Sequence, residues 1–536
     1  MSHPSPLLAP DFEPPDPRRS WVLDRMHWPR PVSTFCATLE LPAMSVGFTN
    51  AQTALGIALD VRLVAVNGYV YASAAAQPGH HVPDDARQRT AARARESAEA
   101  WRAEWEPEVL ADIARLRALD PAALSDASLR LELEDLARRR ARHWELHDRL
   151  VVPIIEAASA FLDLFARLFP GRRVGEAAAL LQGHPNRTVA AASALWQVAR
   201  RASGRPELCA ALLAGQPPEV LRALDGGGEL LASLDAYLHE WGLQMPSLDL
   251  AETPLAEDRR AALARVRQLL RAPCREPDEE LRDAAARRDA LLAQLRAGLR
   301  ERPGDLAELE RALGDASAYV PLQEDHHWLI DQAVPALARR LVLEAGARIA
   351  RGGVIERPDD AFWLELEELL AALGAPGRVR HAVERARVAA RRRAREEQTR
   401  LTPPLFLGAP APPGVSRVRF FGPETIDGSR DGLAGHPGSP GKAVGVARVL
   451  RDPAEMDRLA PGDVLVCEST TPAWTPLFGV ASALVTERGG VLSHTASVAR
   501  EFGIPAVVGA LGATARIREG ELIEVDGDSG LVRRLL

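Results

Sequence analysis

Apolar residues recur at three- and four-residue spacing over much of the chain, from about Pro83 to Arg400. In "LRLELEDLARRRARHWELHDRL" this spacing puts the apolar side chains on one face of a helix, with charged residues opposite. Proline and glycine interrupt the pattern, as in "FPGRR" and "ARGGVIERPDD", where helices should end. The pattern predicts a large, mainly helical domain over residues 21–400, built as a bundle of antiparallel helices.

Two other patterns occur near the beginning of the chain. In "VRLVAVNGYVYAS", β-branched and aromatic residues alternate on either side of Asn67 and Gly68, a pair suited to a tight turn with positive φ. This stretch predicts a β-hairpin. Residues 1–20 are rich in proline and acidic side chains, and we expect them to form a disordered tail.

Helical periodicity stops at Leu401. Residues 401–436 are dense in proline and glycine, which is typical of a semi-rigid linker. Residues 437–536 contain short β-rich runs, glycine turns and one amphipathic stretch from about His494 to Phe502. The expected fold class is therefore multidomain, with a large, mostly α-helical domain followed by a compact C-terminal α/β domain.

Composition and charge narrow the function. The net charge is -7 over 536 residues, and no basic stripe with interleaved aromatic residues occurs, so we expect no nucleic-acid partner. The most apolar stretch, "LVVPIIEAASAFLDLFARLF", is interrupted by Pro153 and by charged residues, and the chain does not start like a signal peptide. These features favour a cytoplasmic protein without a membrane span. Four widely spaced cysteines argue against a disulfide framework or a zinc cluster, and we expect no metal site.

The stretch "ERGGVLSHTASVAREFGIPAVVGA" carries the most specific chemistry. Gly489 and Gly490 allow a sharp turn, Ser493 suits an N-cap, and Gly503 suits a helix end. His494 would then lie at the positive end of a helix, beside free backbone N–H groups that stabilise an anion. A neutral imidazole in that position can accept a phosphoryl group. The alternative is that the histidine only caps the helix or packs against the turn.

This stretch closely resembles the phosphohistidine motif of the swivelling domain in enzymes related to phosphoenolpyruvate synthase and pyruvate phosphate dikinase. "GDVLVCESTTPAWTPLF" and "GSPGKAVGVARV" resemble other parts of the same β/β/α domain, so the resemblance covers residues 437–536. It implies that His494 is the phosphorylated residue. Thr495 departs from the alanine often found in the motif and puts the crowding near the imidazole in question.

The helical domain resembles the acceptor-binding part of rifampicin phosphotransferase and similar proteins. The matching blocks include "WVLDRMHWPRPVS", "LLQGHPNRTVAAASALWQVAR" and "EDHHWLIDQAVPALARRLVLEAGARIARGGVIERPDDAFWLELEELL". An ATP-grasp signal is not visible in the sequence. The combination also resembles the subunit division of phenylphosphate synthase, in which a separate ATP-grasp subunit phosphorylates the histidine. It implies that ATP and Mg²⁺ belong to a phosphoenolpyruvate-synthase-like ATP-grasp partner, and that this chain binds neither cofactor by itself.

Several neighbours of His494 are candidates for the phosphohistidine pocket. An arginine before the glycine turn could pair with phosphoryl oxygens, or else with Glu487 or Glu501. The serine at the N-cap could bond the imidazole or the phosphate as well as cap the helix. Threonine and tryptophan side chains in the preceding loop could shape the pocket, or belong to a purely structural loop. These candidates are Arg488, Gly489, Gly490, Ser493, Thr471, Trp474 and Thr475.

In the helical domain, the polar cluster in "QEDHHWLIDQ" is the first candidate for an acceptor pocket. Transfer to a hydroxyl benefits from a base near the acceptor oxygen, and Asp325 or His326 could serve. A solvated acidic turn or a satisfied buried network is the structural alternative. Lower candidates are a histidine pair at a four-residue spacing and two amides in a matching block. The full set is Glu324, Asp325, His326, His327, His143, His147, Gln182 and Asn186.

The leading hypothesis is a phosphotransferase component with kinase- or dikinase-like chemistry. His494 takes a phosphoryl group from the ATP-grasp partner and passes it to a hydroxyl of a small organic acceptor, with aromatic alcohols among the candidates. The alternative from another class is a non-catalytic binding or regulatory protein that signals through phosphorylation of His494. An enzyme that uses phosphoenolpyruvate on its own is disfavoured, because no phosphoenolpyruvate-binding barrel follows the motif.

Overall fold

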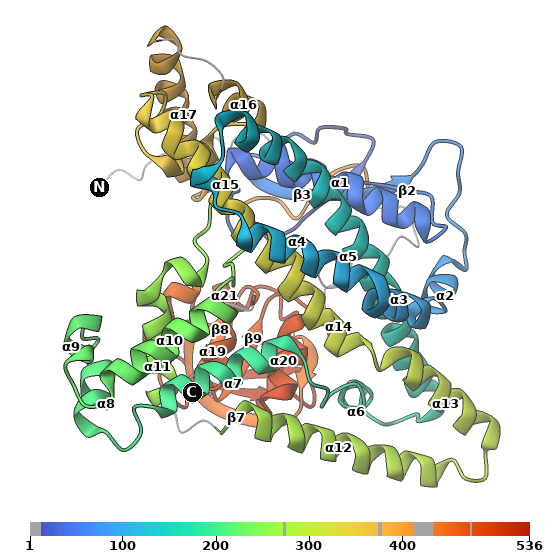
Figure 1. Cartoon of the computed structure of the whole chain (residues 1–536). Helices are drawn as coiled ribbons and strands as arrows, with labels where there is room; N and C mark the ends of the chain where they lie inside the picture. Colours follow the sequence, from blue (N-terminus) through green and yellow to red (C-terminus); the bar gives the residue numbers. More distant parts are fainter. Residues whose placement is uncertain (1–11, 272–274, 374–377, 411–431, 472–473, 536) are drawn as a thin grey trace, which may run out of the picture.

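The computed structural model describes residues 12–271, 275–373, 378–410, 432–471 and 474–535. It contains a large helical region with one small sheet, and a C-terminal domain built on a larger sheet (Figure 1). The expected fold class is confirmed. Among the described residues, no helix is long and apolar enough to cross a membrane.

The small sheet is antiparallel, with strand order β2-β3-β1-β4. The expected hairpin is confirmed, because β2 and β3 pair from Val66 opposite Tyr69, and Asn67 and Gly68 turn with φ values of 48° and 79°. The strands are β1 (Ser20–Leu23), β2 (Leu59–Val66), β3 (Tyr69–Ala76) and β4 (Phe406–Gly408).

Strands occupy both ends of the segment for which we expected a linker, residues 401–436. At one end β4 pairs with β1, and at the other β5 (Gly432–Ala434) pairs with β12 (Leu531–Arg534) of the C-terminal sheet. The helical region therefore extends to Gly408, and the C-terminal domain begins before residue 437. The rest of the expected linker, 411–431, and residues 1–11 of the expected tail lie outside the described residues.

The helical region is organised around α5 (Asp126–Leu168), a helix of 43 residues that packs against α1 (Thr34–Ala54). Its core is rich in large side chains such as Phe35, Trp144 and Phe161, all of them buried. The other elements of this part are α2 (Ala86–Ala91), α3 (Ala94–Ala100), the π-helix η1 (Trp101–Trp105), α4 (Glu106–Ala118), η2 (Pro121–Ala123), α6 (Val174–Ala179), α13 (Pro303–Ala316), α14 (Tyr319–His326), the π-helix η4 (His327–Ala333), α15 (Val334–Arg351), η5 (Pro358–Trp363), α16 (Leu366–Leu373) and α17 (Arg378–Gln398).

A second helical lobe has a core of its own, built mainly from leucines such as Leu195, Leu230 and Leu263. Pro206 and Pro218 stand at the starts of two short helices, where the missing N–H removes no helical bond. The elements are α7 (Arg187–Arg200), α8 (Pro206–Leu213), α9 (Pro218–Arg222), α10 (Gly227–Trp241), η3 (Leu255–Glu257), α11 (Arg259–Arg271) and α12 (Pro277–Gly298).

The C-terminal domain has an eight-stranded sheet in the order β5-β12-β11-β7-β8-β9-β10-β6. Strands β7 to β10 are parallel neighbours, and the remaining pairings are antiparallel. Its other elements are β6 (His436–Ser439), β7 (Lys442–Val449), η6 (Pro453–Arg458), β8 (Val464–Cys467), α19 (Thr475–Phe478), β9 (Ala483–Thr486), α20 (His494–Glu501), β10 (Ala506–Val508), α21 (Ala513–Arg516) and β11 (Leu522–Asp526).

The C-terminal domain lies against the helical region along α6, α11 and α12, as the arrangement in Figure 1 indicates for α11 and α12. Leu492 packs against the large helical core, and Ala264 of α11 packs against the core of the C-terminal domain. Gln268 Nε2 donates a hydrogen bond to the carbonyl of Met456 at 2.8 Å. This docked position brings the start of α20 to the end of α14.

Candidate active site at the domain interface

His494 is placed by a turn and a cap that are both local in sequence. Gly489 has φ 105°, and a Cβ there would lie 2.8 Å from Ser493 Oγ. The Ser493 side chain accepts a hydrogen bond from the backbone N–H of Ala496 at 3.3 Å and starts α20 at His494. The glycine turn, the cap and the helix expected from the sequence are confirmed.

Glu324 of α14 faces His494 across the interface. His494 Nδ1 lies 3.0 Å from Glu324 Oε1, and Thr188 Oγ1 donates to Glu324 Oε2 at 2.5 Å. Burial alone would raise the pKa of Glu324, but His494 and Thr188 together hold it below the usual value, so the group is a carboxylate. A carboxylate can only accept, so Nδ1 carries the proton and the neutral imidazole has its lone pair on Nε2. Among the described residues, His494 Nε2 has no hydrogen-bond partner.

A second imidazole stands beside the first. The rings of His327 and His494 have centroids 5.9 Å apart. His327 Nδ1 lies 2.6 Å from Asp331 Oδ2. Burial by itself would raise the pKa of Asp331. His147 and His327 lower this pKa by more than burial raises it, so this carboxylate also stays ionised. Thus His494 meets a carboxylate and an oriented imidazole at the same interface.

Two further bonds hold the docked position on either side of His494. The Tyr319 hydroxyl of α14 donates to the carbonyl of Leu492, and the backbone N–H of Gly183 donates to Glu501 Oε1 at 3.3 Å. Burial raises the pKa of Glu501 to about 7. Further polar contacts between the domains lie away from His494, among them the ion pairs Arg25–Glu468, Arg30–Asp452 and Arg173–Asp528.

The candidates Arg488 and Gly490, in the turn before His494, have different surroundings. Arg488 is buried, and the acidic group nearest to its Nε is Glu468, with Oε1 at 3.6 Å, rather than Glu487 or Glu501. Its Nε has no hydrogen-bond partner among the described residues. A Cβ at Gly490 would meet no atom within 4 Å, so the chain is open there.

The loop candidates lie beside the interface. Thr471 Oγ1 donates to the carbonyl of Pro246 in the helical region at 3.4 Å. Trp474 is buried in the core of the C-terminal domain. Thr475 is buried too, and its side chain faces a pocket between the domains. Residues 472–473 between them lie outside the described residues.

Within the cluster at the end of α14, neighbouring residues point to different partners. Asp325 Oδ1 accepts the backbone N–H of Arg187 at 3.0 Å, and burial raises the Asp325 pKa to about 6. His326 is fully buried, with Nδ1 2.7 Å from the carbonyl of Leu322, and burial lowers its pKa to about 3. Within the described part of the chain, Glu324 and His327 are the members of this cluster that contact His494.

The two histidines of α5 also differ. His143 Nε2 lies 3.4 Å from Asp112 Oδ2, and burial lowers the His143 pKa to about 3. His147 Nε2 lies 3.8 Å from Asp331 Oδ2, and its ring stands 4.7 Å from that of His326. The pair does not converge on one point, because each histidine has its own acidic neighbour.

The two amide candidates have structural partners. Asn186 caps α7, since its side chain accepts the backbone N–H of Val189 at 3.0 Å. Gln182 lies between Arg500 Nε and Glu501 Oε1, at 3.0 and 2.6 Å, where its amide can accept from the first and donate to the second. Gln182 therefore contributes to domain docking.

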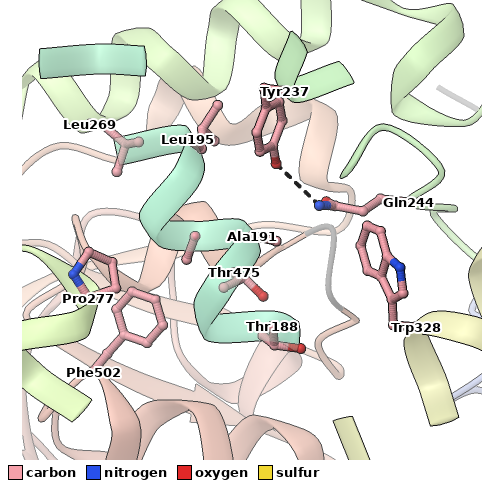
Figure 2. Close-up of a pocket in the computed structure, with 11 residues that line it drawn as sticks. Thr188, Ala191, Leu195, Tyr237, Gln244, Leu269, Pro277, Trp328, Thr475 and Phe502 are labelled. Carbon is pink, nitrogen blue, oxygen red and sulfur yellow. Dashed lines mark hydrogen bonds between the residues drawn. The ribbon is translucent and has the colours of Figure 1, made fainter. Parts of the chain in front are cut away.

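A narrow pocket between the domains is lined by residues of both (Figure 2). In the docked position it is tight, with about 30 Å³ of room for the centres of water-sized molecules. Thr188, which bonds Glu324, is one wall, and Trp328, which follows His327, is another. Tyr237 and Gln244 supply polar groups, bonded to each other at 3.2 Å. The lining is Thr188, Ala191, Ala192, Leu195, Tyr237, Gln244, Leu269, Pro277, Trp328, Thr475 and Phe502.

Sequence reasoning missed three residues of this site. Asp331 stands four positions after His327, which was a usable signal, because residues at that spacing share a helical face. Tyr319 and Thr188 offered no comparable signal. Each contacts its partner only because α14, α7 and the C-terminal domain come together in the fold.

Two family models match the chain. The model described as "PEP-utilising enzyme, mobile domain" matches residues 459–530, and the model described as "Rifampicin phosphotransferase fourth domain" matches residues 147–324. The chain therefore carries the mobile domain of phosphoenolpyruvate-utilising enzymes and a fourth-domain region of the rifampicin phosphotransferase type. Both resemblances expected from the sequence are confirmed.

Individual relatives are similar to longer stretches of the chain, and two of the following three are named phosphotransferases. The chain is 34% identical to chondramide synthase cmdD of Chondromyces crocatus, and the match covers 97% of this chain and 14% of that protein. It is 30% identical to the uncharacterized phosphotransferase YvkC of Bacillus subtilis over 78% of the chain and 50% of that protein. It is 32% identical to a rifampicin phosphotransferase of Streptomyces sviceus over 59% of the chain and 36% of that protein. The chain thus spans half or less of these relatives.

Proposed function

We propose that this protein is a phosphotransferase component in which His494 carries a phosphoryl group. The observation that supports it most is the position of His494, at the start of α20 and docked against Glu324. The relatives named phosphotransferases support the class of reaction. The phosphoryl donor would be ATP bound with Mg²⁺ on an ATP-grasp partner, and the acceptor a hydroxyl of a small organic molecule.

The environment of His494 favours Nε2 as the nitrogen that carries the phosphoryl group. Nδ1 is occupied by Glu324, whereas Nε2 has no partner among the described residues. In the transfer, the N–P bond breaks and a P–O bond forms to the acceptor oxygen, while the hydroxyl proton passes to a neighbouring base. The imidazole is then neutral again, and the Glu324 carboxylate stabilises the proton on Nδ1.

The acceptor would bind in the pocket of Figure 2. Its walls are mainly apolar, which suits an aromatic or otherwise apolar alcohol. Thr475 and Phe502 belong to the C-terminal domain, so the pocket widens when that domain moves away to be recharged. We propose that the acceptor enters in that open position and is enclosed on docking.

The first test charges the histidine without the unidentified partner. Phosphoramidate is a small phosphoryl donor, and intact-mass spectrometry of the full chain should show an acid-labile gain of one phosphoryl group. His494→Ala should show none. His80→Ala, which removes an exposed histidine on a loop, is the matched control and should label as wild type does.

The second test adds an ATP-grasp domain of a related phosphotransferase with Mg-ATP. Labelling of His494 that depends on this domain supports the two-component reaction. Labelling with Mg-ATP alone would show that the chain has a nucleotide site of its own. Failure of His494 to label under either condition, in a folded protein, would overturn the proposal.

A further inference from the structure

Behind the residues that face His494, three metal-binding side chains converge inside the helical region. His147 comes from the middle of α5, His326 ends α14, and Asp331 lies in the π-helix η4. Each can offer one ligand atom, and the three atoms lie within 4.8 Å of one another. The side chains of His326 and Asp331 are almost fully buried, and that of His147 is 13% exposed.

The hydrogen bonds around His326 leave it in the form that binds a metal. Its Nδ1 is 2.7 Å from the carbonyl of Leu322, which can only accept, so Nδ1 carries the hydrogen and Nε2 carries the lone pair. A ring nitrogen bonded to a backbone carbonyl is the usual outer support of a metal-ligating histidine. Among the described residues, the buried His326 Nε2 has no hydrogen-bond partner.

Asp331 likewise has one polar atom that is bonded and one that is left for a ligand. One oxygen, Oδ2, is bonded to His327, whereas Oδ1 is buried and has no partner among the described residues. A buried polar atom without a partner costs about 1–3 kcal/mol, so a ligand that binds His326 Nε2 and Asp331 Oδ1 would remove that cost. Irregular π-helical backbone such as η4 occurs frequently at functional sites.

The dimensions suit a small divalent ion. Ligand atoms about 2.0–2.2 Å from Zn²⁺ lie roughly 3.3–3.6 Å from each other in a tetrahedral site. The ligand atoms of the three side chains lie within 4.8 Å of one another, and His147 Nε2 is 3.8 Å from Asp331 Oδ2, the oxygen that also contacts His327. Side-chain adjustments on the order of 1 Å would complete the set. Two imidazoles and one carboxylate favour a transition ion such as Zn²⁺ over Mg²⁺, which prefers oxygen ligands.

We propose that His147, His326 and Asp331 form a binding site for a divalent transition-metal ion, with a fourth position open beside His327. This inference goes beyond the proposed function and does not depend on phosphoryl transfer. Three protein ligands with an open position are typical of zinc sites that take part in reactions, whereas structural sites are closed by four. The open position would lie at the acceptor side of the interface, because His327 contacts both Asp331 and His494.

The experiment measures metal binding to the full chain directly. Chelator-treated protein is titrated with Co²⁺ and followed by visible absorption, and Zn²⁺ content is measured by mass spectrometry after desalting. We expect one ion per chain, and a Kd at least tenfold weaker in His326→Gln, in His147→Gln and in Asp331→Asn. Mg²⁺ in excess should not displace the ion.

His143→Gln is the matched control. His143 lies one turn before His147 on α5 and is more deeply buried, but its neighbour is Asp112. It should bind Co²⁺ and Zn²⁺ as wild type does. Unchanged binding in His147→Gln and His326→Gln would place any ion elsewhere, and no uptake by folded wild-type protein would mean that water fills the cluster. Either result overturns the site, and circular dichroism of each variant excludes loss of fold as the cause.

Discussion

The two sides of the His494 contact are built in different ways. On the C-terminal side, the turn at Gly489, the cap at Ser493 and His494 itself lie within six consecutive residues. On the helical side, Glu324 is supported by Thr188, which is 136 residues away in sequence. The nucleophile is thus prepared by local structure, whereas the receiving site exists only after several helices have packed. Substitutions on the two sides should therefore have different consequences.

The largest effect is expected on the local side, for Gly489→Ala. A side chain at φ 105° is strained, and the new Cβ would crowd Ser493 Oγ and Cβ at 2.8 and 3.0 Å. We expect a loss of about 2–3 kcal/mol in the local stability of the C-terminal domain, measured by hydrogen exchange of β9 and α20. Gly490→Ala is the control, because that position has no positive φ and no atom within 4 Å. Equal effects at both positions would contradict a conformational role for Gly489.

Glu324→Ala should act on the other side alone. It removes the acceptor of His494 Nδ1 and of Thr188 Oγ1 in a buried place, and should weaken docking by about 2 kcal/mol. Fluorescence energy transfer between labels on the two domains measures docking, and Glu324→Gln should lose less because its amide oxygen still accepts. Phosphoramidate labelling of His494 should persist. If Glu324→Ala reduces the labelling of His494 as well as docking, the helical side is needed to prepare the histidine. The proposed separation between the local side and the helical side would then be wrong.

This asymmetry also explains what the sequence could predict. The phosphohistidine turn, the hairpin at Asn67 and Gly68, and the helical character of the first domain all follow from patterns within about ten residues. The linker was placed too broadly, because β4 and β5 are three-residue strands whose pairing partners, β1 and β12, are remote in sequence. Strands this short carry little pattern of their own.

The candidate site shows the same limit. Glu324 and His327 were in the cluster that sequence singled out, but periodicity gave no reason to prefer them to Asp325 or His326. The fold decides, since α14 turns Glu324 toward His494 and buries the His326 ring against Trp101 and His147. Tertiary contacts of this kind have no signature in a single sequence.

The strength of docking between the two domains should depend on pH, because Glu501 at their interface gains or loses a proton. Burial is the main cause of its raised pKa, and it faces Gly183 N–H, Arg500, Glu324 and Arg287. In the undocked domain the pKa of Glu501 would return toward the ordinary value of 4.5 for a glutamate, so docking takes up a proton. Docking is then strongest at low pH and weakens as pH rises from about 4.5 to about 7. Between pH 6 and 8 the change should be about 1.4 kcal/mol.

Small-angle X-ray scattering of the full chain across this range measures the fraction of docked molecules. Glu501→Gln removes the titrating group while keeping an oxygen that can accept the Gly183 N–H, so its docking should not change with pH in this window. A wild-type protein that docks more tightly at pH 8 than at pH 6 would reverse the sign and contradict this assignment.

The smallest effect is expected for Ser493→Ala. The hydrogen bond from Ala496 N–H to Ser493 Oγ is 3.3 Å long, so the cap should contribute about 0.5–1 kcal/mol, the low end for such residues. Hydrogen exchange of α20 should increase correspondingly, while docking through Glu324 and Tyr319 is retained. This variant therefore distinguishes a residue that only positions His494 from one that also holds the domains together. A small local loss that leaves docking intact shows that the helix start positions His494 without holding the domains together, whereas loss of docking would make Ser493 part of the interface itself.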